Sequence, residues 1–69
     1  MVRHWMREAR EAKGMNMEQA ATALDMSIPY YYMIETGQRK KKLDLPFAMA
    51  VSKVLGVPLT EICDREGII

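Results

Sequence analysis

A run of four basic side chains is the feature of this sequence that points most directly to chemistry. It consists of Arg39, Lys40, Lys41 and Lys42. The whole chain carries a formal charge of only +1, but residues 1–42 hold eight bases against five acids, whereas residues 43–69 hold two against four. Such an asymmetry indicates one face that binds an anion. The alternative is a basic loop that simply faces solvent.

Catalysis and metal binding are not indicated by the remaining reactive side chains. His4 is the only histidine and Cys63 is the only cysteine, so the chain cannot assemble a set of histidine and cysteine metal ligands. No nucleophile–base pair, nucleophile elbow or phosphate-binding glycine pattern is visible. We therefore expect no enzymatic activity, no metal, no cofactor and no small-molecule ligand.

The length of 69 residues allows one small domain, which we assign to residues 1–66, with a short tail at 67–69. A domain of this size is marginal alone and can gain stability from a partner. A single cysteine excludes an internal disulfide, and no apolar run is long enough to span a membrane. Since no signal peptide opens the sequence, we expect a reduced, cytoplasmic setting and no membrane partner.

Glycine and proline divide the sequence into five segments, none of which alternates polar and apolar residues as a half-buried strand would. This pattern predicts a compact, all-α domain of five helices. The first helix covers 2–13 and ends at Gly14, the second follows a cap at Asn16, the third runs from Ser27 to Gly37, the fourth runs from Asp44 to Gly56, and a short fifth opens at 58–60.

Local residue preferences support these limits. Asn16, Ser27 and Asp44 are residue types that cap helix N-termini, and Gln19 stands at the capping-box position of the second helix. Helical spacing predicts the buried faces of the first two helices. These faces comprise Val2, Trp5, Met6, Ala9 and Ala12 in the first, and Ala20, Ala21, Ala23 and Leu24 in the second. Neighbouring helical positions lie about 100° apart, so of the tyrosines at 30–32 we expect one buried, one half-buried and one exposed.

The short connection at residues 24–27 suits two helices that cross steeply, as in a helix-turn-helix. Residues 6–21 (MREAREAKGMNMEQAA), 30–39 (YYYMIETGQR) and 51–57 (VSKVLGV) resemble segments of the phage-repressor and Cro-type helix-turn-helix family, also called the xenobiotic-response-element type. The resemblance covers about residues 3–62. It implies a lambda-repressor-like fold in which the second and third helices form the helix-turn-helix.

The same resemblance implies roles for individual residues. Tyr31 and Ile34 would point inward, while Arg10 and Glu35 would form a partly buried ion pair between the first and third helices. The residues that would face DNA bases are Ser27, Ile28, Pro29, Tyr32 and Met33. The residues that would contact phosphates are Asn16, Met17, Tyr30, Gln38, Arg39, Lys40, Lys41 and Lys42.

The sequence departs from the family pattern at three places. Met17 stands where the family often has a phosphate-binding glutamine, so only its backbone amide can serve there. The base-reading positions hold apolar residues such as Ile28 and Met33 instead of polar ones, which favours contact with thymine methyl groups over bidentate readout of guanine or adenine. The basic loop before the fourth helix is also two or three residues longer than usual.

These features predict a sequence-specific regulator that binds double-stranded DNA with its third helix in the major groove. We expect such a short chain to repress by occupying its site, as a weak homodimer, in association with the nucleoid in a prokaryotic or phage-like intracellular setting. The alternative is a protein-interaction module, such as an antirepressor or antitoxin, that keeps the fold without reading bases.

Overall fold

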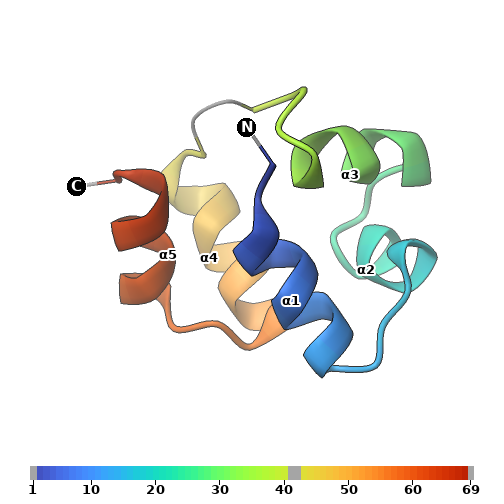
Figure 1. Ribbon diagram of the computed structural model, residues 1–69, viewed down its shortest axis with the longest axis horizontal. Coiled ribbons are helices and arrows are strands. Elements are labelled where there is room, and N and C mark those ends of the chain that lie inside the picture. Colours follow the sequence, from blue (N-terminus) through green and yellow to red (C-terminus); the bar gives the residue numbers. More distant parts are fainter. Residues whose placement is uncertain (1, 41–42, 69) are drawn as a thin grey trace.

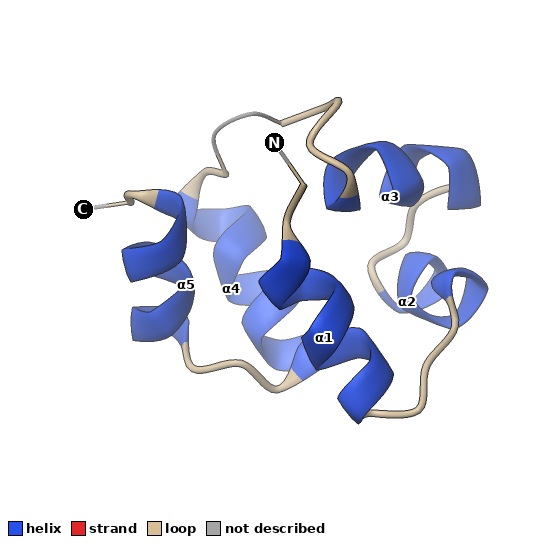
Figure 2. Cartoon of the chain, viewed as in Figure 1, coloured by secondary structure: helices blue, strands red, loops and turns tan. Residues whose placement is uncertain are grey.

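The computed structural model describes residues 2–40 and 43–68. These ranges form five α-helices and no strand: α1 (His4–Ala12), α2 (Met17–Ala23), α3 (Ile28–Glu35), α4 (Leu45–Leu55) and α5 (Leu59–Glu66) (Figure 2). The predicted all-α, five-helix fold is therefore confirmed. Met1, Lys41, Lys42 and Ile69 lie outside the described residues.

Three helices begin at the side-chain caps that the sequence predicts. At the start of α2, the Asn16 side chain accepts from the Gln19 amide at 2.8 Å, and the Gln19 side chain accepts from the Asn16 amide at 2.9 Å. Ser27 caps α3 through the Tyr30 amide, and Asp44 caps α4 through the Phe47 amide. Each cap satisfies a backbone donor that the first helical turn leaves without a partner.

The end of α4 depends on a glycine. Gly56 has φ +73°, a left-handed conformation that residues with a Cβ rarely adopt. A Cβ added there would also lie 3.0 Å from Cε of Lys13, at the end of α1. Gly56 therefore turns the chain toward α5 where α1 and α4 approach each other.

The core lies where α1, α3, α4 and α5 converge. Its largest fully buried side chains are Tyr31, Met6, Ile34, Ile62 and Val51. Figure 1 shows α1 in front of α4, with α5 on one side of this pair and α2 and α3 on the other. The small buried residues Ala20 and Ala21 let α2 pack closely against α3 and α4.

The predicted buried faces are too wide at their edges. Helical spacing predicts that Val2, Ala12 and Ala23 are buried, but all three are exposed. An alanine at the margin of an apolar face is small enough to remain in solvent at little cost. The face that α1 buries is instead centred on Trp5 and Met6 and includes the charged residue Arg10.

Candidate nucleic-acid interface

The arrangement of α2 and α3 is that of a helix-turn-helix. The two helices pack against each other and are joined by the short turn at residues 24–27. Asp25 in this turn has φ +58°, which aspartate tolerates better than most residues. The Met26 amide then donates to the Ala21 carbonyl at 2.9 Å. This hydrogen bond holds the chain at the angle from which α3 starts.

The outward face of α3 is apolar and aromatic. Ile28 and Tyr32 are 45% and 47% exposed, and Tyr30 is also exposed. Tyr31 and Ile34 are fully buried, as expected, so the helix has distinct inner and outer faces. One detail differs from the sequence expectation, because two of the three tyrosines are exposed and none is half-buried.

The structure places the other expected base-reading residues on or beside this outer face. Ser27 and Pro29 are exposed at the start of α3, whereas Met33 is half-buried. The Ser27 hydroxyl accepts from the Tyr30 amide at 3.3 Å, which leaves its own hydrogen free to donate. Exposed side chains therefore gather on the first half of α3.

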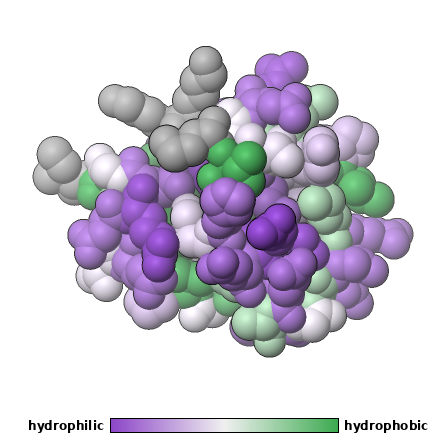
Figure 3. Space-filling view, in the orientation of Figure 1, coloured by the Kyte–Doolittle hydropathy of each residue, from purple (hydrophilic) through white to green (hydrophobic). Residues whose placement is uncertain are grey.

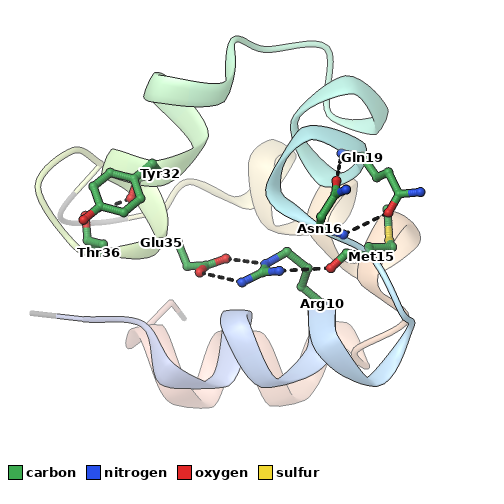
Figure 4. A network of polar contacts seen from close by, with 7 residues as sticks. All are labelled: Arg10, Met15, Asn16, Gln19, Tyr32, Glu35 and Thr36. Atoms are coloured by element: carbon green, nitrogen blue, oxygen red, sulfur yellow. Dashed lines mark hydrogen bonds and ion pairs between the residues drawn. The ribbon is translucent and has the colours of Figure 1, made fainter.

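At the start of α2, Asn16 is exposed while Met17 is half-buried and packs against the core. The Asn16 side chain is engaged in the capping box (Figure 4). Any phosphate contact here would consequently use backbone amides of the first turn and not the Met17 side chain.

The basic loop follows directly from α3. We call its described part, residues 37–40, the basic segment. Its amides at Gln38 and Arg39 both donate to the Met33 carbonyl, at 2.7 and 3.1 Å. Gln38 and Arg39 are exposed, and the half-buried Lys40 places its ammonium 5.1 Å from the centre of the Phe47 ring. The two further expected phosphate contacts, Lys41 and Lys42, lie outside the described residues.

A buried ion pair joins α1 to the end of α3. Arg10 Nε lies 3.0 Å from Glu35 Oε2, and Arg10 Nη2 lies 3.2 Å from Glu35 Oε1 (Figure 4). Arg10 Nη1 also donates to the Met15 carbonyl at 2.9 Å, so one guanidinium ties α1, α3 and the α1–α2 connection together. Hydrogen bonding to Glu35 raises the pKa of Arg10, against the opposing effect of burial.

Tyr31 lies on the inner face of α3, close to this ion pair. Its hydroxyl is buried and makes no hydrogen bond to any residue of the described ranges. Burial raises the pKa of the Tyr31 phenol, and the neighbouring Glu35 carboxylate raises it further. Tyr31 therefore stays neutral and packs in the core beneath α3.

The sequence does not indicate that Arg3 is buried or that it links several parts of the fold. Arg3, which precedes α1, is only 5% exposed and contacts the end of α3, the basic segment and α5. Nothing in its sequence neighbourhood separates it from the exposed Arg7. Its acidic partner, Glu66, lies 63 residues away, so no local pattern could have paired them.

Within 2–40 and 43–68, no group of three histidine, cysteine or acidic side chains could hold a metal ion. None of the helices seen in those ranges has the length and apolar character needed to cross a bilayer. In the view of Figure 3, the surface is mostly hydrophilic, and hydrophobic residues appear only in small separate areas.

Comparison with known proteins agrees with this geometry. A family model described as helix-turn-helix matches residues 6–62. A Bacillus subtilis (strain 168) protein named as an uncharacterized HTH-type transcriptional regulator, YqaF, is 37% identical over 59 residues, which cover 86% of this chain and 70% of that protein. No solved structure matches the chain.

Proposed function

The chain belongs to the helix-turn-helix family, and on that premise we propose that it binds double-stranded DNA and represses transcription by occupying its site. The observation that carries this proposal is the pairing of two exposed elements. The outer face of α3 is exposed at residues 28–30 and at Tyr32, and the basic segment with Arg39 follows the end of the same helix. The major groove admits a helix, and phosphates line its edges.

The proposal assigns different tasks to these two elements. Ser27, Ile28, Pro29, Tyr32 and Met33 face the bases, while Gln38, Arg39, Lys40, Lys41, Lys42, Tyr30 and the start of α2 at Asn16 and Met17 contact phosphates. The α2 helix and the Arg10–Glu35 pair hold α3 at a fixed angle. Positive charge supplies affinity for any duplex, and α3 supplies preference among sequences.

Selection of bound sites from a random pool of duplex DNA tests this function directly. We expect enrichment of a short motif, and an affinity for it that falls by about 0.9 log unit per tenfold rise in salt for each phosphate neutralised. Failure to enrich any motif, together with an affinity that does not depend on salt, would contradict the proposal.

The composition of α3 predicts the chemistry of the bases that it reads. Residues 27–33 contain no asparagine, glutamine, arginine or lysine, so they lack the side chains that bind guanine or adenine in a bidentate way. Ile28 and Tyr32 instead offer exposed apolar surface, which suits the methyl group of thymine. The selected motif should therefore contain thymines at the base pairs that α3 contacts.

Replacing a contacted thymine with deoxyuridine removes only that methyl group. We expect each such replacement to weaken binding about fourfold, because one buried methyl is worth roughly 0.8 kcal/mol. Titration of labelled duplexes measures the change. The Ile28→Ala variant is the matched control, since it has already lost the apolar contact and should not distinguish the two duplexes at the base that Ile28 touches.

A second candidate function rests on the same apolar surface. Exposed Ile28, Tyr30 and Tyr32 could dock on a protein, as in an antirepressor or antitoxin, and contiguous apolar surface often marks such sites. The two functions give opposite results with nucleic acid. A protein-docking α3 predicts no salt-dependent binding to any duplex, whereas the DNA-binding proposal requires it.

We further propose a weak homodimer through α4 and α5 that forms or strengthens on DNA. The Ile68 side chain packs against the core of its own domain, so it offers little to a partner, and Ile69 lies outside the described residues. Leu45 and Met49, by contrast, lie one turn apart on α4 and are exposed. These two side chains give the contact its apolar centre.

We expect sedimentation equilibrium to show self-association at high protein concentration, and two protomers on a two-fold related DNA site. The Met49→Glu variant should remain monomeric, because it would bring two carboxylates into the contact. Ala12→Glu makes the same one-unit change of charge at an exposed position on α1, outside α4 and α5, and is the matched control. Wild-type protein that stays monomeric and binds DNA as one protomer per site would rule out the dimer.

A further inference from the structure

Arg3 is the centre of a buried polar cluster that the proposed DNA contacts do not use. We call Arg3, Trp5 and Glu66 the N-terminal cluster. Arg3 Nη1 donates to the Ile34 carbonyl at 2.6 Å and to the Arg39 carbonyl at 3.4 Å, and Nη2 donates to the Lys40 carbonyl. One guanidinium therefore bonds the last turn of α3 and two consecutive carbonyls of the basic segment.

Two further contacts fix Arg3 itself. Its backbone amide donates to the Glu35 carbonyl at 2.8 Å, and its Nε donates to Glu66 Oε1 at 3.0 Å. The other oxygen of Glu66 accepts from the indole N–H of Trp5 at 2.8 Å. Glu66 is the last residue of α5, and its side chain is only 9% exposed. The Glu66 carboxylate that orients Arg3 is therefore itself held in place by its hydrogen bond to Trp5.

The backbone of the basic segment needs such support. Lys40 has φ +49°, a left-handed conformation that is unfavourable for a residue with a Cβ and persists only when its surroundings impose it. The Gln38 and Arg39 amides are anchored to Met33, but the carbonyls of Arg39 and Lys40 accept from Arg3. In Figure 1 the N-terminal segment runs beside the end of α3 and the start of the following loop.

We propose that Arg3 is a positioning residue for DNA binding, which holds the basic segment in register with α3 and is itself held by Glu66. This inference rests on the proposed function. The phosphate-binding side chains of the segment are then set at a fixed distance from the base-reading side chains. Arg3 is too buried to reach DNA itself. The N-terminal cluster therefore affects DNA affinity only through the backbone geometry of the basic segment.

The Glu66→Gln variant tests the proposal through the sign of its effect. It removes a negative charge, so general electrostatics alone predict tighter binding to DNA. A glutamine has one carbonyl oxygen and cannot give Arg3 and Trp5 a carboxylate oxygen each. Positioning therefore predicts the opposite result, namely binding about three- to tenfold weaker and a salt slope lower by about one phosphate contact.

Two variants complete the experiment. Glu61→Gln makes the same change of charge on the same helix, in an exposed ion pair with Arg65, and should bind DNA at least as tightly as wild type. Arg3→Lys keeps the net charge but has three donors in place of the guanidinium fork, so it should weaken binding in the same way as Glu66→Gln. Circular dichroism at the binding temperature verifies that each variant is folded.

Amide hydrogen exchange in the free protein supplies a readout that does not involve DNA. In Arg3→Lys and Glu66→Gln, exchange at Gln38 and Arg39 should accelerate while that of core amides in α3, such as Ile34, stays as in wild type. Uniform acceleration throughout the domain would indicate general destabilisation and would overturn the positioning role.

The outcomes separate this inference from the function on which it rests. Wild-type protein that binds no duplex DNA overturns both. Wild-type protein that binds DNA with the expected salt slope, while Glu66→Gln behaves like Glu61→Gln, overturns only the role of Arg3. Weaker binding by both cluster variants, with faster exchange confined to the basic segment, supports it.

Discussion

Replacing Glu35 with alanine will destabilise the domain by about 3–5 kcal/mol, because it leaves the guanidinium of Arg10 buried without its counter-charge. A chain of this length has a total stability of roughly 3–10 kcal/mol at typical per-residue values, so much of the variant will be unfolded at room temperature. Urea denaturation followed by circular dichroism measures the change. Glu18→Ala, which removes an exposed carboxylate from α2, should stay within about 0.5 kcal/mol of wild type.

A double variant separates the cost of an orphaned charge from the net value of the pair. Arg10→Met with Glu35→Leu replaces both partners with apolar side chains of similar size, a change that is often neutral or stabilising for a buried pair. We expect this double variant to be more stable than either single variant, even though the Met15 carbonyl loses its donor. Free-energy changes that simply add would show that the two side chains are not coupled.

The second large effect concerns the division between phosphate contact and base reading. Arg39→Ala should weaken binding to every duplex by a similar factor and lower the salt slope by about one, because one phosphate contact is lost. Tyr32→Ala should leave the slope nearly unchanged and relax the preference at one base pair by about 1–3 kcal/mol. Fluorescence anisotropy at several salt concentrations, on the selected site and on single-base variants, measures both effects.

Lys53→Ala is the control for charge. Lys53 is exposed on the last turn of α4 and is not among the residues proposed to contact DNA. Its loss should therefore change the salt slope much less than the loss of Arg39. Should Arg39→Ala and Tyr32→Ala both bind like wild type at low salt, α3 and the basic segment are not the DNA surface. The protein-docking function would then explain the exposed residues of α3 better.

The five helices, and the starts of α2, α3 and α4, could be predicted because the signals are local, whereas α1 has no side-chain cap and begins at His4, two residues later than predicted. Asn16, Ser27 and Asp44 each accept a hydrogen bond from an amide three residues ahead, so the residue type alone indicates the cap. The inward orientation of Tyr31 and Ile34 came from the family resemblance, which encodes the packing of α3 against its neighbours. The exposure of Ala12 and Ala23 was not predicted, since apolar spacing does not say where a buried face stops.

The helical elements, the three side-chain caps and the family follow from the amino-acid sequence alone, because each depends on residues within a few positions of one another or on a motif of fixed order. The burial of Arg3, and its contacts with α3, the basic segment and α5, depend instead on the tertiary packing. Hydrogen bonds from one guanidinium to the carbonyls of Ile34 and Lys40 depend on how distant helices pack. Every residue has the same backbone carbonyl, so the sequence cannot predict which carbonyls accept hydrogen bonds from Arg3.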